Sequence, residues 1–328
     1  MSNIIITSLD PGQNTGGVKA KIDIINFLKD YGYSSYEVNP YVTRIKKFFL
    51  ANFKLPKDIS NLSPKKVIIQ YPIPSQYITK QIIKNIRKSK NSKIVFLIHD
   101  IQGLQSTDEK TIKKELKVFD LVDELIVHNN HMKNWLQKKG LKKPLINLEI
   151  FDYKNPQPIS KKIESKRSIC FAGNLFKSEF LKKINLKHEI YVFGPNMFSE
   201  YSNCIKYSGQ YSPGELPKYL NQSFGLIWDG PSIETCEGTY GSYLKFNNPH
   251  KTSLYISSGL PVVIWRQAAL ADFVLQNKIG IVIDNLNQLD SALDSVSQQK
   301  YKEIKSNTLV IAERLRTGYY TKKAVDRA

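Results

Sequence analysis

The chain has 328 residues, 41% of them hydrophobic, which is enough to bury a core; its length favours two domains over one. It shows no signal segment, no uncharged run of membrane-spanning length and only three separated cysteines, so we expect a cytoplasmic protein without disulfides or structural zinc. The net charge of +19 is spread along the chain without a nucleic-acid-binding motif, so we expect no nucleic-acid partner and attribute the charge to a lysine-rich surface or to contact with an anionic membrane.

The chain opens with a strand–loop–helix pattern. A strand at 3–7 is followed by a loop that contains Gly16 and Gly17, and a helix pattern runs from Val18 to Leu28. Glycines let a backbone approach a ligand closely, so Gly16 and Gly17 are candidate ligand contacts. A purely structural loop is the alternative, because the loop matches neither the GxxxxGK[ST] nor the GxGxxG phosphate-binding motif. Asp10 in this loop is a candidate base.

A basic and aromatic segment follows at Lys46–Lys54, which contains three phenylalanines among its cations. Such a mixture can lie on a lipid surface or receive a lipid-borne acceptor. The alternative is a helix whose apolar face packs inward.

Two apolar runs predict buried strands at 66–71 and 93–98, and a third run predicts one at 124–127. The second run ends in the polar pair His99 and Asp100. Because the carboxyl ends of parallel strands meet substrates in open α/β sheets, Asp100 is the leading candidate for a general base and His99 a supporting one. A packed histidine next to a helix cap is the alternative.

The prolines and charges at 154–167 predict a linker, after which the strand and helix pattern begins again. We therefore expect an N-terminal Rossmann-like domain at 1–152 and a C-terminal Rossmann-like domain at 153–310. A C-terminal helix at 311–328 is expected to pack back on the first domain. Further strands are predicted at 168–173, 189–194, 224–228, 260–265 and 280–284, and a helix capped by Ser212 is predicted to run to about Gln222.

The stretch 243–284 contains the strongest site pattern. A basic loop precedes a helix that starts near 250, then come a buried strand and a second helix from Ala268. A helix N-terminus carries a partial positive charge and unpaired N–H groups, which suit a phosphate. Together with Lys245 and Lys251, this order predicts a site for a nucleotide diphosphate.

Several segments resemble a known family. These are Ile98–Ile101, the linker Glu149–Tyr153, Phe171–Leu175, Asn248–Ser253 and Ser258–Val263. They are similar to the streptococcal glucosyltransferase 3 group, which glycosylates serine-rich repeat adhesins, and the same layout occurs in bacterial β-1,6-galactofuranosyltransferases. The resemblance spans nearly the whole chain and implies the GT-B fold, an α/β architecture with two Rossmann-like domains whose parallel sheets face a central cleft. It also implies that the domain at 1–152 binds the acceptor and that the domain at 153–310 binds the nucleotide-sugar donor.

The resemblance also implies roles for individual residues. Lys177, Lys245 and Lys251 would contact phosphates, and the N–H groups of Gln267, Ala268 and Ala269 would hold the diphosphate or the sugar. A plain surface position is the alternative for each lysine. Tyr211 and Asp229 would contact the uracil or ribose, and Asn248 the sugar hydroxyls; the alternative for Asn248 is a helix entry together with Pro249. Asn174 and Tyr243 complete the expected donor-binding set.

The implied activity is transfer of a hexose, with glucose as the first candidate, from a UDP-sugar to a sugar acceptor on a glycoprotein or cell-surface glycan. Inversion with Asp100 as the base is expected, without a metal cofactor; the absence of a DxD triplet agrees with this. The alternatives are a galactofuranosyltransferase of polysaccharide biosynthesis, a non-catalytic nucleotide-binding partner subunit and a nucleic-acid-binding protein. We further expect a homo-oligomer.

Overall fold

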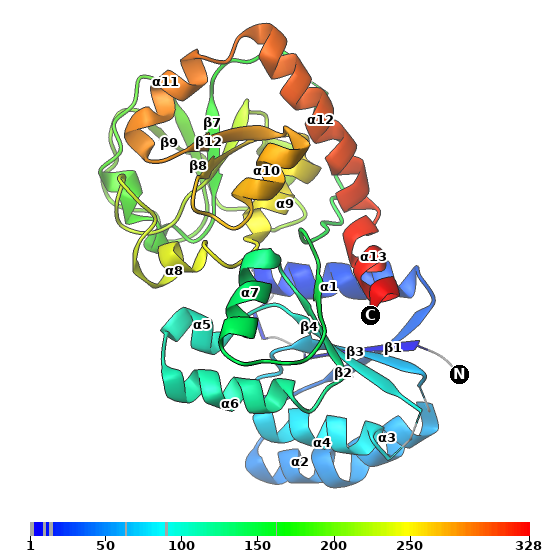
Figure 1. Cartoon of the computed structure of the whole chain (residues 1–328). Helices are drawn as coiled ribbons and strands as arrows, with labels where there is room; N and C mark the ends of the chain where they lie inside the picture. Colours follow the sequence, from blue (N-terminus) through cyan, green and yellow to red (C-terminus); the bar gives the residue numbers. More distant parts are fainter. Residues whose placement is uncertain (1–2, 9–10, 13–15, 63, 89–90, 162) are drawn as a thin grey trace. The chain divides into compact units, whose positions relative to one another are not determined.

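The structure is a computed structural model that describes residues 3–8, 11–12, 16–62, 64–88, 91–161 and 163–328. The chain divides into two compact units (Figure 1). Unit 1 contains most of the chain up to Leu148 together with Thr321–Ala328, and unit 2 contains Glu149–Tyr320.

Unit 1 is built on a six-stranded sheet in the order β2-β1-β3-β4-β5-β6, and all of its pairings are parallel. Its inner strands are almost continuous runs of buried apolar residues, as expected for parallel strands covered on both faces. The strands are β1 (Asn3–Ser8), β2 (Tyr33–Val38), β3 (Lys66–Tyr71), β4 (Lys93–Ile98), β5 (Glu124–Val127) and β6 (Leu145–Asn147).

Helices connect these strands. Side-chain oxygens of Ser75, Asp108 and Asn129 accept hydrogen bonds from first-turn N–H groups, which explains where three of the helices begin. The helices are α1 (Gly16–Lys29), α2 (Arg44–Phe49), the π-helix η1 (Leu50–Lys54), α3 (Leu55–Leu62), α4 (Gln76–Ile86), α5 (Gln102–Ser106), α6 (Glu109–Phe119), α7 (Asn130–Lys138) and, at the C-terminus, α13 (Tyr319–Arg327).

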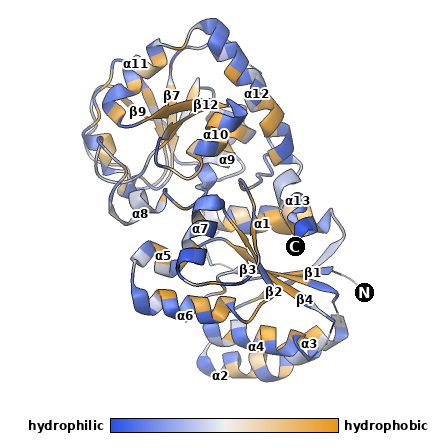
Figure 2. Cartoon of the chain, in the orientation of Figure 1, coloured by the Kyte–Doolittle hydropathy of each residue, from blue (hydrophilic) through white to orange (hydrophobic). Residues whose placement is uncertain are grey.

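Unit 2 repeats this plan with a second parallel six-stranded sheet in the order β12-β11-β10-β7-β8-β9. Figure 2 shows the strands of both sheets as largely hydrophobic. The strands are β7 (Ile169–Ala172), β8 (Ile190–Phe193), β9 (Ile205–Tyr207), β10 (Phe224–Ile227), β11 (Val262–Trp265) and β12 (Gly280–Ile283).

The helices of unit 2 are of uneven length. The longer ones are α8 (Gly238–Tyr243), α9 (His250–Ser257), α10 (Ala271–Asn277), α11 (Leu289–Asp294) and α12 (Gln298–Arg316). Short 3₁₀ turns are η2 (Leu175–Lys177), η3 (Glu179–Lys182), η4 (Leu216–Tyr219) and η5 (Leu286–Gln288). Among the residues that the structure describes, none of the helices has the length and apolar character needed to cross a bilayer.

Each of the predicted strands is present, and the predicted α/β class is confirmed. In unit 2 the first strand of the unit, β7, lies inside the sheet between β10 and β8. Successive strands are therefore added on one side of β7 up to β9 and on its other side from β10 onward, although all strands run parallel. Such a reversal of the strand order marks the usual ligand site of an open α/β sheet, at the carboxyl ends of the strands.

Candidate functional site

The reversal point of unit 2 is held together by Tyr255 of α9. The Tyr255 hydroxyl accepts a 2.6 Å hydrogen bond from the backbone N–H of Ala172, the last residue of β7. Its ring packs over β10 at Gly225, where any Cβ would lie 2.2 Å from the ring. This packing places the N-terminus of α9, and with it Lys251, beside the ends of β7 and β10.

The Lys251 ammonium lies between the two strand ends. It donates to Asp229 Oδ1 at 2.9 Å and to the Trp228 carbonyl at 3.1 Å, both just after β10. It is also 4.5 Å from the ring centroid of Phe171 on β7. The Lys251 side chain is only 14% exposed. An ammonium has three N–H donors. Two of them are used by the described residues, so one remains for a ligand oxygen.

Lys245 and Asp229 share one environment with Lys251 around the buried thiol of Cys236. Burial raises the pKa of this thiol, and the negative charge of Asp229 raises it further, whereas a hydrogen bond to the Asp229 backbone and the ammonium groups of Lys251 and Lys245 lower it. The thiol is therefore protonated at neutral pH, and two cations and one carboxylate gather around it. The Lys245 ammonium also lies 5.5 Å from the ring centroid of Trp265 at the end of β11.

Lys177 lies in η2, the turn that follows β7. Its ammonium is 3.9 Å from the ring centroid of Tyr240, and its carbonyl accepts a hydrogen bond from Gly230 N–H at 3.2 Å. Gly230 has φ +107°, and a Cβ there would meet the Glu237 carbonyl at 2.4 Å, so glycine is required. The loop after β10 thus packs against the turn that carries Lys177.

Asn174 begins that turn. Its Oδ1 accepts from Phe176 N–H at 3.2 Å and from the Asn196 side chain at 2.8 Å. Asn174 is exposed, but both hydrogen bonds of its side-chain oxygen go to the protein and connect the loops that follow β7 and β8.

Tyr211 forms an aromatic platform with a residue that the sequence prediction did not include. Its ring stacks on Tyr219 with centroids 3.8 Å apart and an interplanar angle of 19°. Phe193, the last residue of β8, lies 6.4 Å from the Tyr211 ring. A helix predicted from Ser212 to about Gln222 is wrong: only η4 forms, because Pro213, Gly214 and Pro217 do not favour a longer helix.

Two predicted amide contacts are corrected by the structure. Ala268 N–H donates to the Trp265 carbonyl at 3.0 Å, and Ala269 N–H donates to the Leu244 carbonyl at 2.8 Å. Both residues are buried, so these amides are not presented to a ligand. The helix predicted to start at Ala268 begins at Ala271, whereas Gln267 lies exposed in the preceding turn.

Asn248 and Tyr243 also differ from their predicted roles. Asn248 is 4% exposed, and its side-chain amide donates to the Glu149 carbonyl at 3.2 Å. Ser253 Oγ donates similarly to the Phe151 carbonyl at 2.6 Å, so Asn248 and Ser253 hold the linker segment Glu149–Tyr153 in place. Tyr243 is 5% exposed and belongs to the core. The geometry gives neither residue a surface for a sugar.

In unit 1, His99 is held by a hydrogen-bonded amide. His99 Nε2 lies 2.6 Å from Gln70 Oε1, while Gln70 Nε2 donates to the Lys21 carbonyl at 3.2 Å. That orientation of the Gln70 amide makes its oxygen the acceptor, so His99 Nε2 carries the hydrogen. A neutral His99 can accept a proton only at Nδ1.

Asp100 is exposed and lines a pocket of about 610 Å³ in unit 1. Its Oδ1 accepts from Gln105 Nε2 at 2.9 Å. Gly16 and Gly17 form the exposed first turn of α1, which begins earlier than the predicted Val18. Asp10 lies outside the described residues.

The family models named "Glucosyltransferase 3-like" match both parts of this chain. The N-terminal domain matches residues 3–150 and the C-terminal domain residues 169–328. The chain belongs to the glucosyltransferase 3-like family.

Similar proteins agree with this assignment. The chain is 32% identical over 327 residues to the beta-1,6-galactofuranosyltransferase WbbI of Escherichia coli (strain K12). This match covers 98% of this chain and 96% of the relative. It is 22% identical over 244 residues to glucosyltransferase 3 of Streptococcus gordonii, covering 73% and 71% respectively. A solved alpha-glucosyltransferase in complex with UDP has a similar fold, with TM-score 0.57, 13% identity and coverage of 100% and 99%.

The predicted resemblance and the GT-B fold are thereby confirmed, and the chain is a glycosyltransferase. The nucleic-acid-binding and non-catalytic alternatives are set aside. In this glucosyltransferase 3-like protein, unit 2 carries cations and an aromatic platform after its strands. Unit 1, considered by itself, carries the carboxylate of Asp100 after β4.

Glu115 of α6, which the sequence pattern does not single out, is a buried carboxylate in the pocket of Asp100. Glu115 Oε1 accepts from the Tyr71 hydroxyl at 2.9 Å and from Gln102 N–H at 3.1 Å, and Oε2 accepts from Gly103 N–H at 2.6 Å. It therefore fixes the first turn of α5. In the sequence it looks like one more charge on a surface helix, so no signal distinguishes it. The platform partner Tyr219 was missed because it lies in the region predicted as an ordinary helix.

Proposed function

We propose that this glycosyltransferase transfers a hexose from a UDP-sugar to a sugar acceptor on a glycoprotein or cell-surface glycan. The observation that carries the proposal is the position of the Lys251 ammonium at the strand reversal of unit 2, with Lys245 in the same environment. A diphosphate leaving group gains negative charge in the transition state, and fixed cations stabilise that charge. The similar fold of a glucosyltransferase solved with UDP supports the choice of nucleotide.

Galactofuranose is the first donor sugar to test, and glucose the second. Identity is 32% to the galactofuranosyltransferase over nearly the whole chain, against 22% to the glucosyltransferase over a shorter span. This order reverses the expectation from the sequence alone, which placed glucose first.

In the proposed site, the remaining N–H of Lys251 and the ammonium groups of Lys245 and Lys177 meet the phosphate oxygens. The N-terminus of α9, the helix that begins one residue before Lys251, adds a favourable dipole. The uracil stacks on the aromatic platform of Tyr211 and Tyr219. Since these cations can balance the charge of the diphosphate, we propose a reaction that uses no metal.

For inversion, we propose that Asp100 removes the proton from the acceptor hydroxyl as that oxygen attacks the anomeric carbon. The bond from the anomeric carbon to the diphosphate oxygen breaks, and UDP leaves with the bonding electrons. His99 is the second candidate for the base and would act through Nδ1. We also propose that the protein forms homo-oligomers, which light scattering tests.

A ligand screen tests the donor. Thermal unfolding is measured with UDP-galactofuranose, UDP-glucose, UDP and, as a control, the corresponding guanosine nucleotides. A ligand at about one hundred times its dissociation constant stabilises the folded state by about 2.7 kcal/mol, which gives a clear rise in Tm. Turnover of the bound sugar nucleotide with a glycan acceptor array then identifies the sugar and acceptor. Equal shifts with uridine and guanosine nucleotides, or no shift with either, would contradict the proposed donor class.

A further inference from the structure

Unit 1 carries an exposed apolar cluster that its own core does not use. Its members are Ile45, Phe48, Phe49 and Phe53, which are exposed by 72%, 53%, 56% and 62%. α2 has no buried residue among those described. The three phenylalanine rings contact one another, with centroids between 5.7 and 6.4 Å apart. We call these four residues the Phe cluster.

Cations surround the Phe cluster on the same helical run. Within the part of the chain that the structure describes, none of them forms an ion pair, so their charge is available to an outside partner. They are Arg44, Lys46, Lys47, Lys54 and Lys57.

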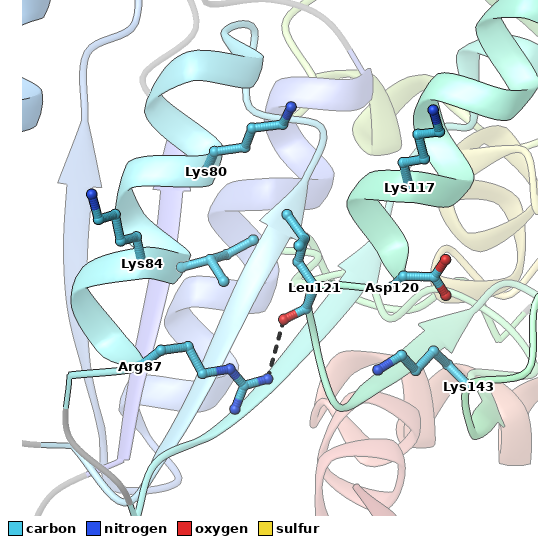
Figure 3. Close-up of a pocket in the computed structure, with 8 residues that line it drawn as sticks. Lys80, Lys84, Arg87, Lys117, Asp120, Leu121 and Lys143 are labelled. Atoms are coloured by element: carbon cyan, nitrogen blue, oxygen red, sulfur yellow. Dashed lines mark hydrogen bonds between the residues drawn. The ribbon is translucent and has the colours of Figure 1, made fainter.

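A basic groove extends this surface across α4. It has a volume of about 700 Å³. Figure 3 shows its charged side chains: Lys80 and Lys84 of α4, Arg87 just after α4, Lys117 of α6, Lys143 before β6, and one carboxylate, Asp120. Arg87 is paired with Asp123 at 2.8 Å and donates to the Leu121 carbonyl at 3.1 Å. The lysines form no ion pair with any described residue; they are Lys80, Lys84, Lys117 and Lys143.

The Phe cluster and the basic groove are parts of one surface. η1, which carries Phe53, packs against α4, and Asn52 Nδ2 donates to the Tyr77 hydroxyl at 2.8 Å. Lys80 and Lys84 follow Tyr77 by three and seven positions, so they lie on the same side of α4 as Tyr77. The aromatic side chains thus adjoin a row of lysines.

We propose that the Phe cluster and the basic groove form a docking surface for an anionic lipid bilayer. The apolar side chains enter the interface between headgroups and acyl chains, while the lysines lie at the level of the phosphates. A second copy of the chain fits this surface less well, because a symmetric contact through the same patch would bring like charges together. This inference concerns unit 1 alone and does not depend on the proposed donor.

Vesicle co-sedimentation tests the proposal with the full chain. Wild-type protein is mixed with vesicles of phosphatidylcholine alone or of phosphatidylcholine with phosphatidylglycerol. Binding is expected only to the anionic vesicles, and added salt should weaken it because charge contributes to it. Equal binding to both vesicle types, or binding to neither, would overturn the proposal.

Two sets of variants locate the surface. The double variant Phe48→Ser with Phe53→Ser should bind anionic vesicles at least about tenfold more weakly, since two apolar side chains no longer enter the lipid. Lys80→Glu with Lys84→Glu should also weaken binding. Leu275→Ser and Val310→Ser, which change exposed apolar residues of unit 2, serve as matched controls. Since the Phe side chains are largely exposed, we expect the first variant to keep the wild-type Tm.

The oligomeric state separates the lipid surface from a protein contact. If the wild type is a dimer that the Phe variant converts to a monomer, and vesicle binding of the variant equals that of the wild type, the surface is an interface between copies and the proposal fails. An unchanged oligomeric state with lost vesicle binding supports it. The affinity of the Phe variant for UDP should equal that of the wild type, which keeps this test separate from the proposed donor site.

Discussion

The two units share an architecture, though not a strand order, and they carry different charged groups near the ends of their strands. Each has a parallel six-stranded sheet in which the first strand of the unit lies inside the sheet. In unit 1 the polar groups near the end of β4 include the carboxylates of Asp100 and Glu115. In unit 2 the corresponding edge carries the ammonium groups of Lys245 and Lys251, with Asp229 as the counter-ion.

This difference shows that one architecture can present two kinds of chemistry through the side chains at its strand ends. A carboxylate can accept a proton, whereas partly buried ammonium groups can hold an anion. The proposed division of labour follows: unit 1 handles the acceptor proton and unit 2 the diphosphate. Each half of that division can be tested separately.

The largest effect is expected from removing the carboxylate in unit 1. Asp100→Asn should lower kcat by about 10²–10⁴-fold, because general-base catalysis contributes in that range. The KM for the donor should stay near the wild-type value, since the proposed donor contacts lie in unit 2. Steady-state kinetics across pH provide the measurement, and Asp120→Asn, which changes another exposed aspartate of unit 1, is the control.

An unchanged kcat for Asp100→Asn would show that Asp100 is not the general base. A large loss in His99→Ala together with that result would assign the role to His99 Nδ1. The proposed division would then survive with a different residue.

A smaller loss is expected from removing a cation in unit 2. Lys251→Ala should lower kcat/KM by roughly 10²–10³-fold, comparable to the loss of one preorganised donor to a developing negative charge. Calorimetry should also show weaker UDP binding. Lys206→Ala, at an exposed lysine of β9, is the control.

A second variant shows whether Lys251→Ala loses activity because the cation is missing or because the loop around Asp229 is destabilised. Lys251→Ala leaves the partly buried Asp229 without its ion pair, so the double variant with Asp229→Asn removes this cost. Recovery of Tm without recovery of activity would support the role of the cation. Recovery of both would show that Lys251 acts only by keeping the loop folded.

The sequence predicts the inner strands well and the sheet edges poorly. The inner strands β3, β4 and β11 are apolar runs that local pattern alone identifies. β2, β6 and β9 were missed: all three lie at sheet edges, β2 and β9 carry polar and exposed residues, and β6 has only three residues. Tertiary pairing, not local preference, decides these elements. The fourth edge strand, β12, is an apolar run and was predicted.

For the site, sequence position identifies which lysines follow strands but not which atoms remain available. Lys251 lies at the strand reversal, as its place before an apolar helix suggested. The amides of Ala268 and Ala269 are used inside the chain, and Asn248 holds the linker. Hydrogen bonds between segments far apart in the sequence determine these outcomes, and a single sequence does not encode them visibly.

The aromatic platform of unit 2 provides a third test. Tyr211→Ala should weaken UDP binding by roughly tenfold, because stacking of a base on an aromatic ring contributes on the order of 1–3 kcal/mol. Tyr211→Phe keeps the ring and should bind UDP like the wild type. Equal affinities for the alanine and phenylalanine variants would place the uracil elsewhere. Unit 1 has no proposed base contact, so its variants should leave this affinity unchanged.

The smallest effect concerns the stability of unit 1. His128 is buried beyond the end of β5, its Nε2 lies 3.1 Å from the Ile98 carbonyl, and burial lowers its pKa from 6.5 to about 4. Between these pH values the unfolded chain binds a proton that the folded chain excludes, so the free energy of unfolding falls as the pH is lowered, by at most about 1.4 kcal/mol per pH unit. Urea unfolding at several pH values should show a steeper loss for the wild type than for His128→Gln, which cannot titrate. Lys305 of unit 2, whose pKa burial lowers to about 8, is charged in both states across this range and leaves the slope unchanged. Equal slopes for wild type and variant would mean that His128 becomes charged without unfolding unit 1.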